Sequence, residues 1–442
     1  MRRTTLHAAV LALLGVLSGL SWSTCSPANA QDSAQAGARP PSRGEYLARA
    51  GDCVACHSAR GGKAFAGGLR MGTPMGAIYS TNITPDPQTG IGNYSLQDFE
   101  RAVRSGIAKD GHRLYPAMPY PSYSKITDAD LRALYDFFMK EVPPVNQANK
   151  PTEIPWYLHP RWPLAAWDWV FAPKGPYVAR QDHDAAWNRG AYLVEGLGHC
   201  GACHTPRGFA FQEKALDAGS TAFLQGAELD AWSAPNLRGD RRTGLGAWSE
   251  DDIVTLMKTG HNNRATVFGS MLDVINNSTP YLSDQDLHAM AVYLKSLSAT
   301  AQQAAFKYDD ATAQGLRSNK PRAVGAALYL GACGVCHGAE GKGQPPFMPP
   351  LAGNPAVLDG NPASLINLVL NGAEPLVPSG IPDAYRMPQF RLQLTDEQIG
   401  QVLSFVRSAW GNDAAAVTTE QVRTLRPVTD PSSDRVIVLK MR

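Results

Sequence analysis

The residues of this 442-residue chain best suited to chemistry are cysteines and histidines, which recur in three copies of one motif. Two cysteines with two residues between them are followed at once by a histidine, at 53–57, 200–204 and 333–337. Two thiols at this spacing on a helical turn can add to both vinyl groups of a haem, and the adjacent imidazole can then bind the iron. The motifs predict three covalently bound haem c groups, with cysteines at Cys53, Cys56, Cys200, Cys203, Cys333 and Cys336 and iron ligands at His57, His204 and His337.

Other uses of paired cysteines fit the pattern less well. One pair could be a thioredoxin-like redox site or half a zinc site, but zinc needs further paired ligands and a redox pair does not need the histidine. An even cysteine count in an exported chain would ordinarily predict disulfides. Here Cys25 lies in a predicted leader and all six other cysteines belong to the motif, so haem attachment is favoured.

The segments around the motifs are also repeated, which predicts three copies of one helical unit. A glycine followed by aromatic and aliphatic residues precedes each motif, at 43–47, 189–193 and 325–330, and should let another helix cross closely. Capping signals predict middle helices from Ser95 to Gly106 and from Ser249 to Gly260. Closing helices should begin where a capping residue precedes Asp or Gln by three positions, at Thr127 with Asp130, Ser283 with Asp286 and Thr395 with Gln398.

The fold class expected from these repeats is all-α, with three tandem class I cytochrome c-like domains that have few helices and long loops around haem. We place the domains at 42–147, 185–300 and 319–412, with a C-terminal tail at 413–442. A linker at 148–184 is rich in proline and tryptophan. It should pack across a domain interface or against a partner, because it is too apolar for a free tether.

A sixth iron ligand is expected from the loop between the middle and closing helices, and methionine is the usual soft donor there. Met118, Met271 and Met387 occupy matching positions in the three repeats. The rival methionines are Met71, Met75, Met257, Met290 and Met348. Backbone carbonyls of Pro235 and Pro350 are candidates to accept the second ring proton of the motif histidines.

The charge balance bears on the class of partner, and the N-terminal segment indicates the cellular compartment. The chain has 41 basic and 39 acidic residues, so no global field favours nucleic acid as a partner. Residues 1–30 read as a secretory signal with two arginines, an apolar stretch and an Ala-Asn-Ala cleavage site. We expect cleavage near Ala30 and a periplasmic protein, at most peripheral on the inner membrane.

The chain resembles the triheme cytochrome c subunit of bacterial membrane-associated dehydrogenases for alcohols, gluconate and other sugars. The resemblance runs from about Arg43 to Asn412. Besides the three motifs it is carried by the segments Tyr79–Asp86 with Gly90–Gly92, Tyr115–Tyr120, and Trp410–Asn412.

The resemblance implies an electron relay, with no catalytic residues of its own, from a partner dehydrogenase subunit to ubiquinone or another acceptor. The partner would be a quinoprotein or flavoprotein, and a molybdenum-containing dehydrogenase or a terminal-oxidase relay stays open. A haem enzyme such as a peroxidase is the alternative, and it would need an iron without a strong sixth ligand. Family members often attach to the membrane through their C-terminal stretch, whereas the tail here has only Val436–Leu439 as an apolar run.

Overall fold

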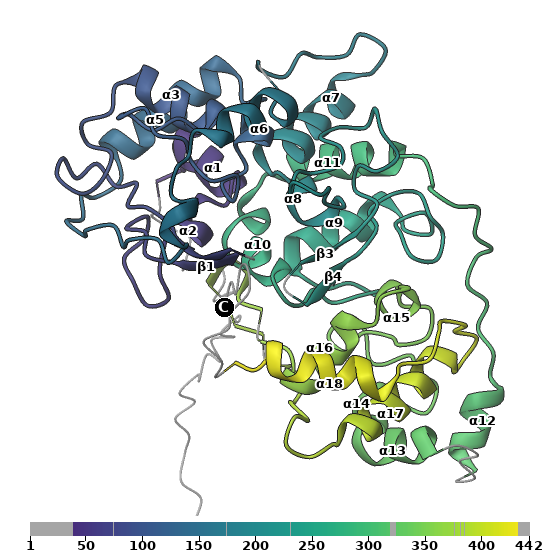
Figure 1. Ribbon diagram of the computed structural model, residues 1–442. Helices are drawn as coiled ribbons and strands as arrows, with labels where there is room; N and C mark the ends of the chain where they lie inside the picture. The colour runs from purple at the N-terminus through teal and green to yellow at the C-terminus, as the bar shows by residue number, and fades with distance from the viewer. Residues whose placement is uncertain are drawn as a thin grey trace, which may run out of the picture. The chain divides into compact units, whose positions relative to one another are not determined.

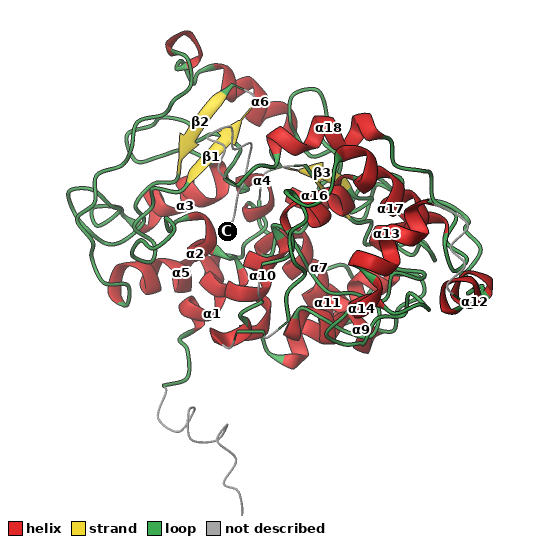
Figure 2. Cartoon of the chain, turned by 90° about the horizontal axis from the view of Figure 1, so that it is seen from below, coloured by secondary structure: helices red, strands yellow, loops and turns green. Residues whose placement is uncertain are grey.

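The computed structural model describes residues 39–431, except 74, 174, 230, 319–323, 375, 381 and 384. These residues are mostly helical, as predicted, with long loops between short helices (Figure 1). Two short antiparallel hairpins, seen in yellow in Figure 2, were not predicted. The predicted leader, the predicted start of the third domain at 319 and the apolar run at 436–439 lie outside the described residues.

The three repeats share an order of elements: an N-terminal helix, the haem motif, a loop, a middle helix, a second loop and a closing helix. The first contains α1 (Arg43–Ala50), α2 (Cys53–Cys56), β1 (Arg70–Thr73), β2 (Gly76–Tyr79), α3 (Leu96–Ser105), α4 (Tyr120–Tyr123) and α5 (Asp128–Lys140). The second contains α7 (Ala185–Ala191), η2 (Tyr192–Leu197), α8 (Gly201–His204), β3 (Ala227–Leu229), β4 (Trp232–Ala234), α9 (Glu250–Thr259), α10 (Met271–Asn277), η3 (Thr279–Tyr281) and α11 (Asp284–Ser296). The third contains α13 (Val324–Ala332), α14 (Gly334–His337), α15 (Pro355–Leu358), α16 (Ala363–Asn371), η4 (Pro378–Gly380) and α17 (Asp396–Ser408).

The remaining helices connect or follow the repeats: η1 (Trp156–Leu158), α6 (Pro163–Phe171), α12 (Ala311–Arg317) and α18 (Thr419–Val428). Helix α18 lies in the predicted C-terminal tail. It packs on α16 and α17 through the fully buried Val422. The described part of this tail therefore belongs to the core of the third repeat.

A glycine brings the N-terminal and closing helices together in every repeat, as predicted. An added Cβ at Gly44, Gly190 or Gly325 would lie 2.0–2.2 Å from a backbone oxygen of the closing helix. Figure 1 shows the resulting pairs, α1 with α5 and α7 with α11. Only glycine permits this approach, because a real Cβ would overlap the facing backbone.

The second repeat has one residue more than the first between this glycine and its first motif cysteine, ten positions against nine. The structure accommodates the extra residue in η2, which is a turn of π-helix directly after α7. A π-turn widens a helix by one residue without ending it. The glycine contact upstream and the haem motif downstream therefore both keep their places.

The predicted helix caps form, with one informative difference. Ser95 and Ser249 make complete capping boxes, and the helices that they open end at left-handed Gly106 and Gly260. Thr395 also makes a complete box. Thr127 and Ser283 cap only through their own side chains, because the carboxylates three positions later bind arginine and tyrosine instead.

The hydrophobic side chains divide unevenly among the repeats. One continuous cluster contains buried residues of both the first and the second repeat, among them Leu47, Leu134, Leu193 and Leu287. The third repeat has a separate cluster around Tyr329, Ile366, Val402 and Trp410. The first two repeats thus share a core. The third has its own and also packs on the second through a smaller cluster of Val267, Leu272, Ile275 and Leu376.

The linker packs against both neighbouring repeats through α6, as expected of an apolar connection. Trp167 donates from its indole nitrogen to the Ala210 carbonyl at 2.9 Å, and its ring lies against Tyr120. Asp168 accepts a 2.7 Å hydrogen bond from Tyr120. Other tryptophans of the linker face outward, since Trp156, Trp162 and Trp169 are 78–80% exposed.

The glycine contact predicts opposite effects for two substitutions in α13. Gly325→Ala should lower the free energy of unfolding by about 1–3 kcal/mol, because the methyl group overlaps the facing helix. Gly331→Ala, where a Cβ meets nothing within 4 Å, should raise it by about 0.5–1 kcal/mol through helix propensity. Thermal unfolding of the haem-loaded protein measures both, and equal effects would contradict the close crossing.

Candidate haem attachment sites

Each motif folds into one helical turn that gathers its reactive groups. The histidine amide donates to the carbonyl of the first cysteine at 3.0 Å in all three motifs. This bond spans four residues, so the two cysteines, three positions apart, lie on the same side of the turn. None of these six cysteines forms a disulfide, which leaves their sulfurs available for attachment to haem vinyl groups.

Burial favours the protonated form of four of the six thiols. Burial raises the pKa of Cys53, Cys56 and Cys200 to about 12 and that of Cys333 to about 11. A zinc site would need thiolates, which require lowered pKa values. Across the described ranges no group of three or more histidine, cysteine, aspartate or glutamate side chains could hold a metal ion. The donor set therefore fits haem better than zinc.

The motif histidines are oriented by backbone carbonyls of the loop that follows. Nδ1 lies 2.7 Å from the Thr81 oxygen in His57, 2.8 Å from Pro235 in His204 and 3.3 Å from Pro349 in His337. Because a carbonyl only accepts, we assign the proton to Nδ1, which leaves the Nε2 lone pair free for iron. Burial also lowers the pKa of all three imidazoles, which favours the neutral form that binds metal.

The carbonyl predictions have mixed outcomes. Pro235 is confirmed as the acceptor for His204. The prediction for Pro350 is wrong by one residue, because the Pro350 carbonyl accepts from the side chain of Asn354 at 3.0 Å and the Pro349 carbonyl faces His337 instead. Thr81 was not identified from the sequence.

Two asparagines that sequence reasoning missed, the buried Asn82 and the half-buried Asn236, hold two of these carbonyls in place. Asn82 follows Thr81, donates to Val145 at 2.8 Å and accepts from the Thr84 amide at 2.9 Å. Asn236 follows Pro235 and likewise accepts from the amide two positions later, at 2.7 Å. The available signal was the alignment of residues 81–86 with 235–240, where each acceptor residue precedes an asparagine.

Comparison with known proteins agrees with this geometry. The family model for cytochrome c matches residues 41–140 and 323–410. The chain is 52% identical over 392 residues to the gluconate 2-dehydrogenase cytochrome c subunit of Pantoea cypripedii, covering 87% of this chain and 89% of that one. It is 50% identical over 398 residues to the alcohol dehydrogenase (quinone) cytochrome c subunit of Gluconacetobacter polyoxogenes, covering 88% and 85%.

The chain belongs to the family of dehydrogenase cytochrome c subunits. It carries three covalently bound haem c groups and serves as an electron-transfer subunit of a dehydrogenase complex. It is also 38% identical over 377 residues to a nicotinate dehydrogenase subunit of Pseudomonas putida, covering 85% of this chain and 30% of that protein. Bound haem supplies reversible one-electron chemistry at its iron.

The three methionines expected as sixth ligands lie at different local structures in the cytochrome c subunit. Met118 follows the middle helix in a tight turn, in which its amide donates to Tyr115 and its carbonyl accepts from Tyr120. Met271 is the first residue of α10. Met387 lies in a coil segment and its carbonyl accepts from Ala373. All three are partly buried against hydrophobic clusters of their own repeats.

Two buried carboxylates beside the motifs were not predicted from the sequence. Asp52 precedes Cys53 in a left-handed conformation, and its Oδ1 has no hydrogen-bond partner among the described residues. Glu213 packs against Gly201 inside the second motif, with its side chain 6% exposed. Burial raises the pKa of Glu213 to about 7, although Arg207 and Lys125 oppose the shift.

The described helices are short on the scale of a bilayer. None of those within the described ranges is both long and apolar enough to cross a membrane.

Glu213 should give the cytochrome c subunit a pH-dependent component of stability. Its pKa is higher in the folded protein than the ordinary 4.5, so the folded state favours the protonated carboxyl. The contribution of this carboxyl to stability is therefore complete below pH 4.5 and is lost as the pH rises through 7. The loss should reach about 3 kcal/mol in the free energy of unfolding. In denaturant titrations from pH 4.5 to 8, the free energy of unfolding of Glu213→Gln should increase by this amount relative to that of the wild type. If the free energies of unfolding of the two proteins changed with pH in parallel, the raised pKa of Glu213 would be contradicted.

Proposed function

We propose that this subunit accepts electrons from a catalytic dehydrogenase subunit and passes them, through its three haems, to ubiquinone or another respiratory acceptor in the periplasm. The observation that carries the proposal is the threefold site: three pairs of cysteines in one chain, each beside an imidazole whose Nδ1 faces a backbone carbonyl. Several redox centres in one chain suit a relay, because an electron can move in short steps. The leader at 1–30 and cleavage near Ala30 support the periplasmic setting.

The sixth iron ligands we propose are Met118, Met271 and Met387. Most of their rivals are engaged elsewhere: Met71, Met257 and Met290 are buried in hydrophobic clusters. Met348 exchanges backbone hydrogen bonds with Gln344, and Met75 is 43% exposed on a hairpin turn. Three closed irons favour electron transfer over a haem enzyme such as a peroxidase, which needs an open position.

The proposed partner is a quinoprotein or flavoprotein that oxidises an alcohol, gluconate or a related sugar, with a molybdoprotein as the second candidate. The names of the relatives support this range, since they include gluconate, alcohol and nicotinate dehydrogenases. The exposed tryptophans of the linker, Trp156, Trp162 and Trp169, also support assembly, because tryptophan is enriched in protein–protein interfaces. The proposed domain limits, 42–147, 185–300 and 319–412, place this linker between the first two haem domains.

The relay predicts activity that depends on a second subunit. The purified chain should oxidise no alcohol, sugar acid or aldehyde and reduce no peroxide at useful rates. Its haems should be reduced quickly once the partner dehydrogenase and its substrate are added. Absorbance of the reduced haems measures this, and substrate turnover by the isolated chain would favour the haem-enzyme alternative.

Each proposed methionine ligand predicts a spectroscopic change. Replacing Met118, Met271 or Met387 by alanine should abolish the sulfur-to-iron charge-transfer band of one ferric haem and lower its potential by about 0.1 V or more. The buried core methionine Met290, replaced by leucine, is the matched control and should leave both unchanged. An unchanged spectrum for one of the three variants would transfer the ligand role to another methionine of that repeat.

A further inference from the structure

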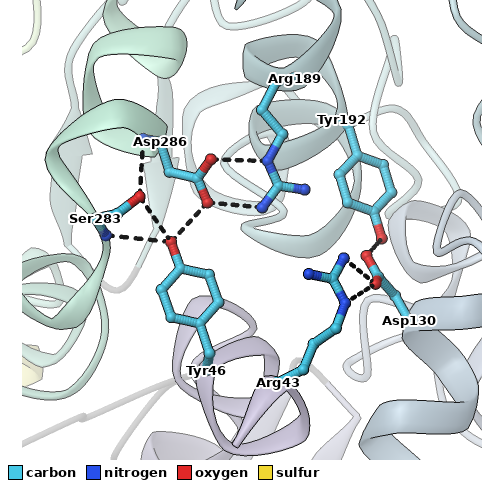
Figure 3. Close-up of polar contacts among 7 residues, drawn as sticks. All are labelled: Arg43, Tyr46, Asp130, Arg189, Tyr192, Ser283 and Asp286. Carbon is cyan, nitrogen blue, oxygen red and sulfur yellow. Dashed lines mark hydrogen bonds and ion pairs between the residues drawn. The ribbon is translucent and has the colours of Figure 1, made fainter. Parts of the chain in front are cut away.

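The first two repeats exchange a pair of identical polar contacts. In Figure 3, Arg43 binds Asp130 of its own repeat, and Tyr192 of the other repeat donates to the same carboxylate at 2.7 Å. Arg189 binds Asp286 of its own repeat, and Tyr46 of the first repeat donates to it at 2.6 Å. Each tyrosine thus crosses from its own N-terminal helix to the start of the closing helix of the other repeat.

The exchange extends to the next turn of both N-terminal helices. Three residues after Tyr46, Arg49 lies over the ring of Tyr281, 4.1 Å from its centroid. Three residues after Tyr192, Glu195 binds Lys125 at 2.8 Å. Lys125 and Tyr281 each stand two residues before the N-cap of a closing helix. Each position of repeat one that contacts repeat two therefore has an equivalent position in repeat two that contacts repeat one.

Reciprocal contacts of this kind define an isologous interface, the arrangement found about the twofold axis of a homodimer. Here it is built inside one chain, between two repeats that share one hydrophobic cluster. Apolar contacts are not directional, whereas hydrogen bonds to a carboxylate depend on angle and distance. The polar exchange is therefore the part of this interface able to fix orientation.

The third repeat lacks every side chain that the exchange needs. By alignment on the helix-crossing glycines, Val324 stands in place of the arginine and Ala327 in place of the tyrosine. Gln398 stands in place of the aspartate, three residues after its N-cap, and completes a capping box instead. Val324 is 63% exposed.

The same interface contains the backbone that leads into the first two haem motifs. Tyr123 donates to the Gly51 carbonyl at 2.9 Å, and its ring packs edge-on against His199. Gly51 lies two residues before Cys53, and His199 directly precedes Cys200.

We propose that Tyr46 and Tyr192 are positioning residues of the relay, which hold the attachment sites of the first two haems as one fixed pair while the third haem domain stays outside this arrangement. The proposal needs three attached haems but not the identity of the donor or the acceptor. The tyrosines act through Asp286 and Asp130 and touch no reacting group. Losing both hydroxyls should leave the shared apolar core in place and remove the two tyrosine-to-carboxylate hydrogen bonds that help to fix its register.

The experiment compares haem-loaded full-length Tyr46→Phe/Tyr192→Phe with the wild type. We expect loss of the Soret circular-dichroism couplet that arises from the two coupled haems, and slower electron equilibration between haems after a laser flash. Haem content and the individual redox potentials should stay unchanged, since the iron ligands are untouched. Tyr135→Phe is the matched control, because its hydroxyl donates to Tyr94 at 2.9 Å within the first repeat, and it should behave as wild type.

A double variant with the wild-type couplet and equilibration rate would overturn the proposal. If the double variant does not fold, the single variants carry the test, because each leaves one half of the exchange intact. Each should weaken the couplet, and wild-type couplets in both would overturn the proposal. These readouts use no dehydrogenase partner, so a failure of the proposed relay to ubiquinone would be seen separately.

Discussion

The hydrogen bond from each motif histidine to a loop carbonyl is the constraint around which each repeat is built. A helical turn can present two thiols and an imidazole, but it cannot by itself fix which ring nitrogen faces the iron. The structure solves this three times with a carbonyl 12 to 31 residues downstream. The loop must be held rigidly to do so, which explains the side-chain hydrogen bonds of Asn82 and Asn236 and the two hairpins that precede these residues.

The rest of each repeat follows from the need to surround a large flat group with few residues. Gly44, Gly190 and Gly325 remove the spacing that a side chain would impose, so two helices meet almost backbone to backbone. A small domain buries limited apolar surface, and close helix packing with a shared core offsets part of that limit. The first two repeats also merge their main cores, whereas the third keeps its main core to itself and meets the second through a smaller cluster.

The three similar domains divide their contacts unequally. The repeats are alike where they hold haem and differ where they meet one another. The aspartates at 130 and 286 show how the difference arises. Their carboxylates bind an arginine and a tyrosine and do not accept from the N-cap amide as a complete capping box requires. In the third repeat Gln398 keeps its box, and no tyrosine of the described residues crosses to it.

Much of the site could be predicted from the sequence alone. The three motifs, the helix-crossing glycines and the capping residues depend on spacing within a few residues, and local spacing is what a sequence states directly. Tertiary structure decided what depends on distant backbone: that the Pro349 carbonyl and not that of Pro350 meets His337, that Thr81 serves His57, and that a π-turn absorbs one extra residue. It also decided the pairing of the first two repeats. Arg43, Tyr46, Asp130 and their counterparts look like ordinary helix-terminal residues in the sequence, and only folding brings groups 62 to 240 positions apart within hydrogen-bonding distance.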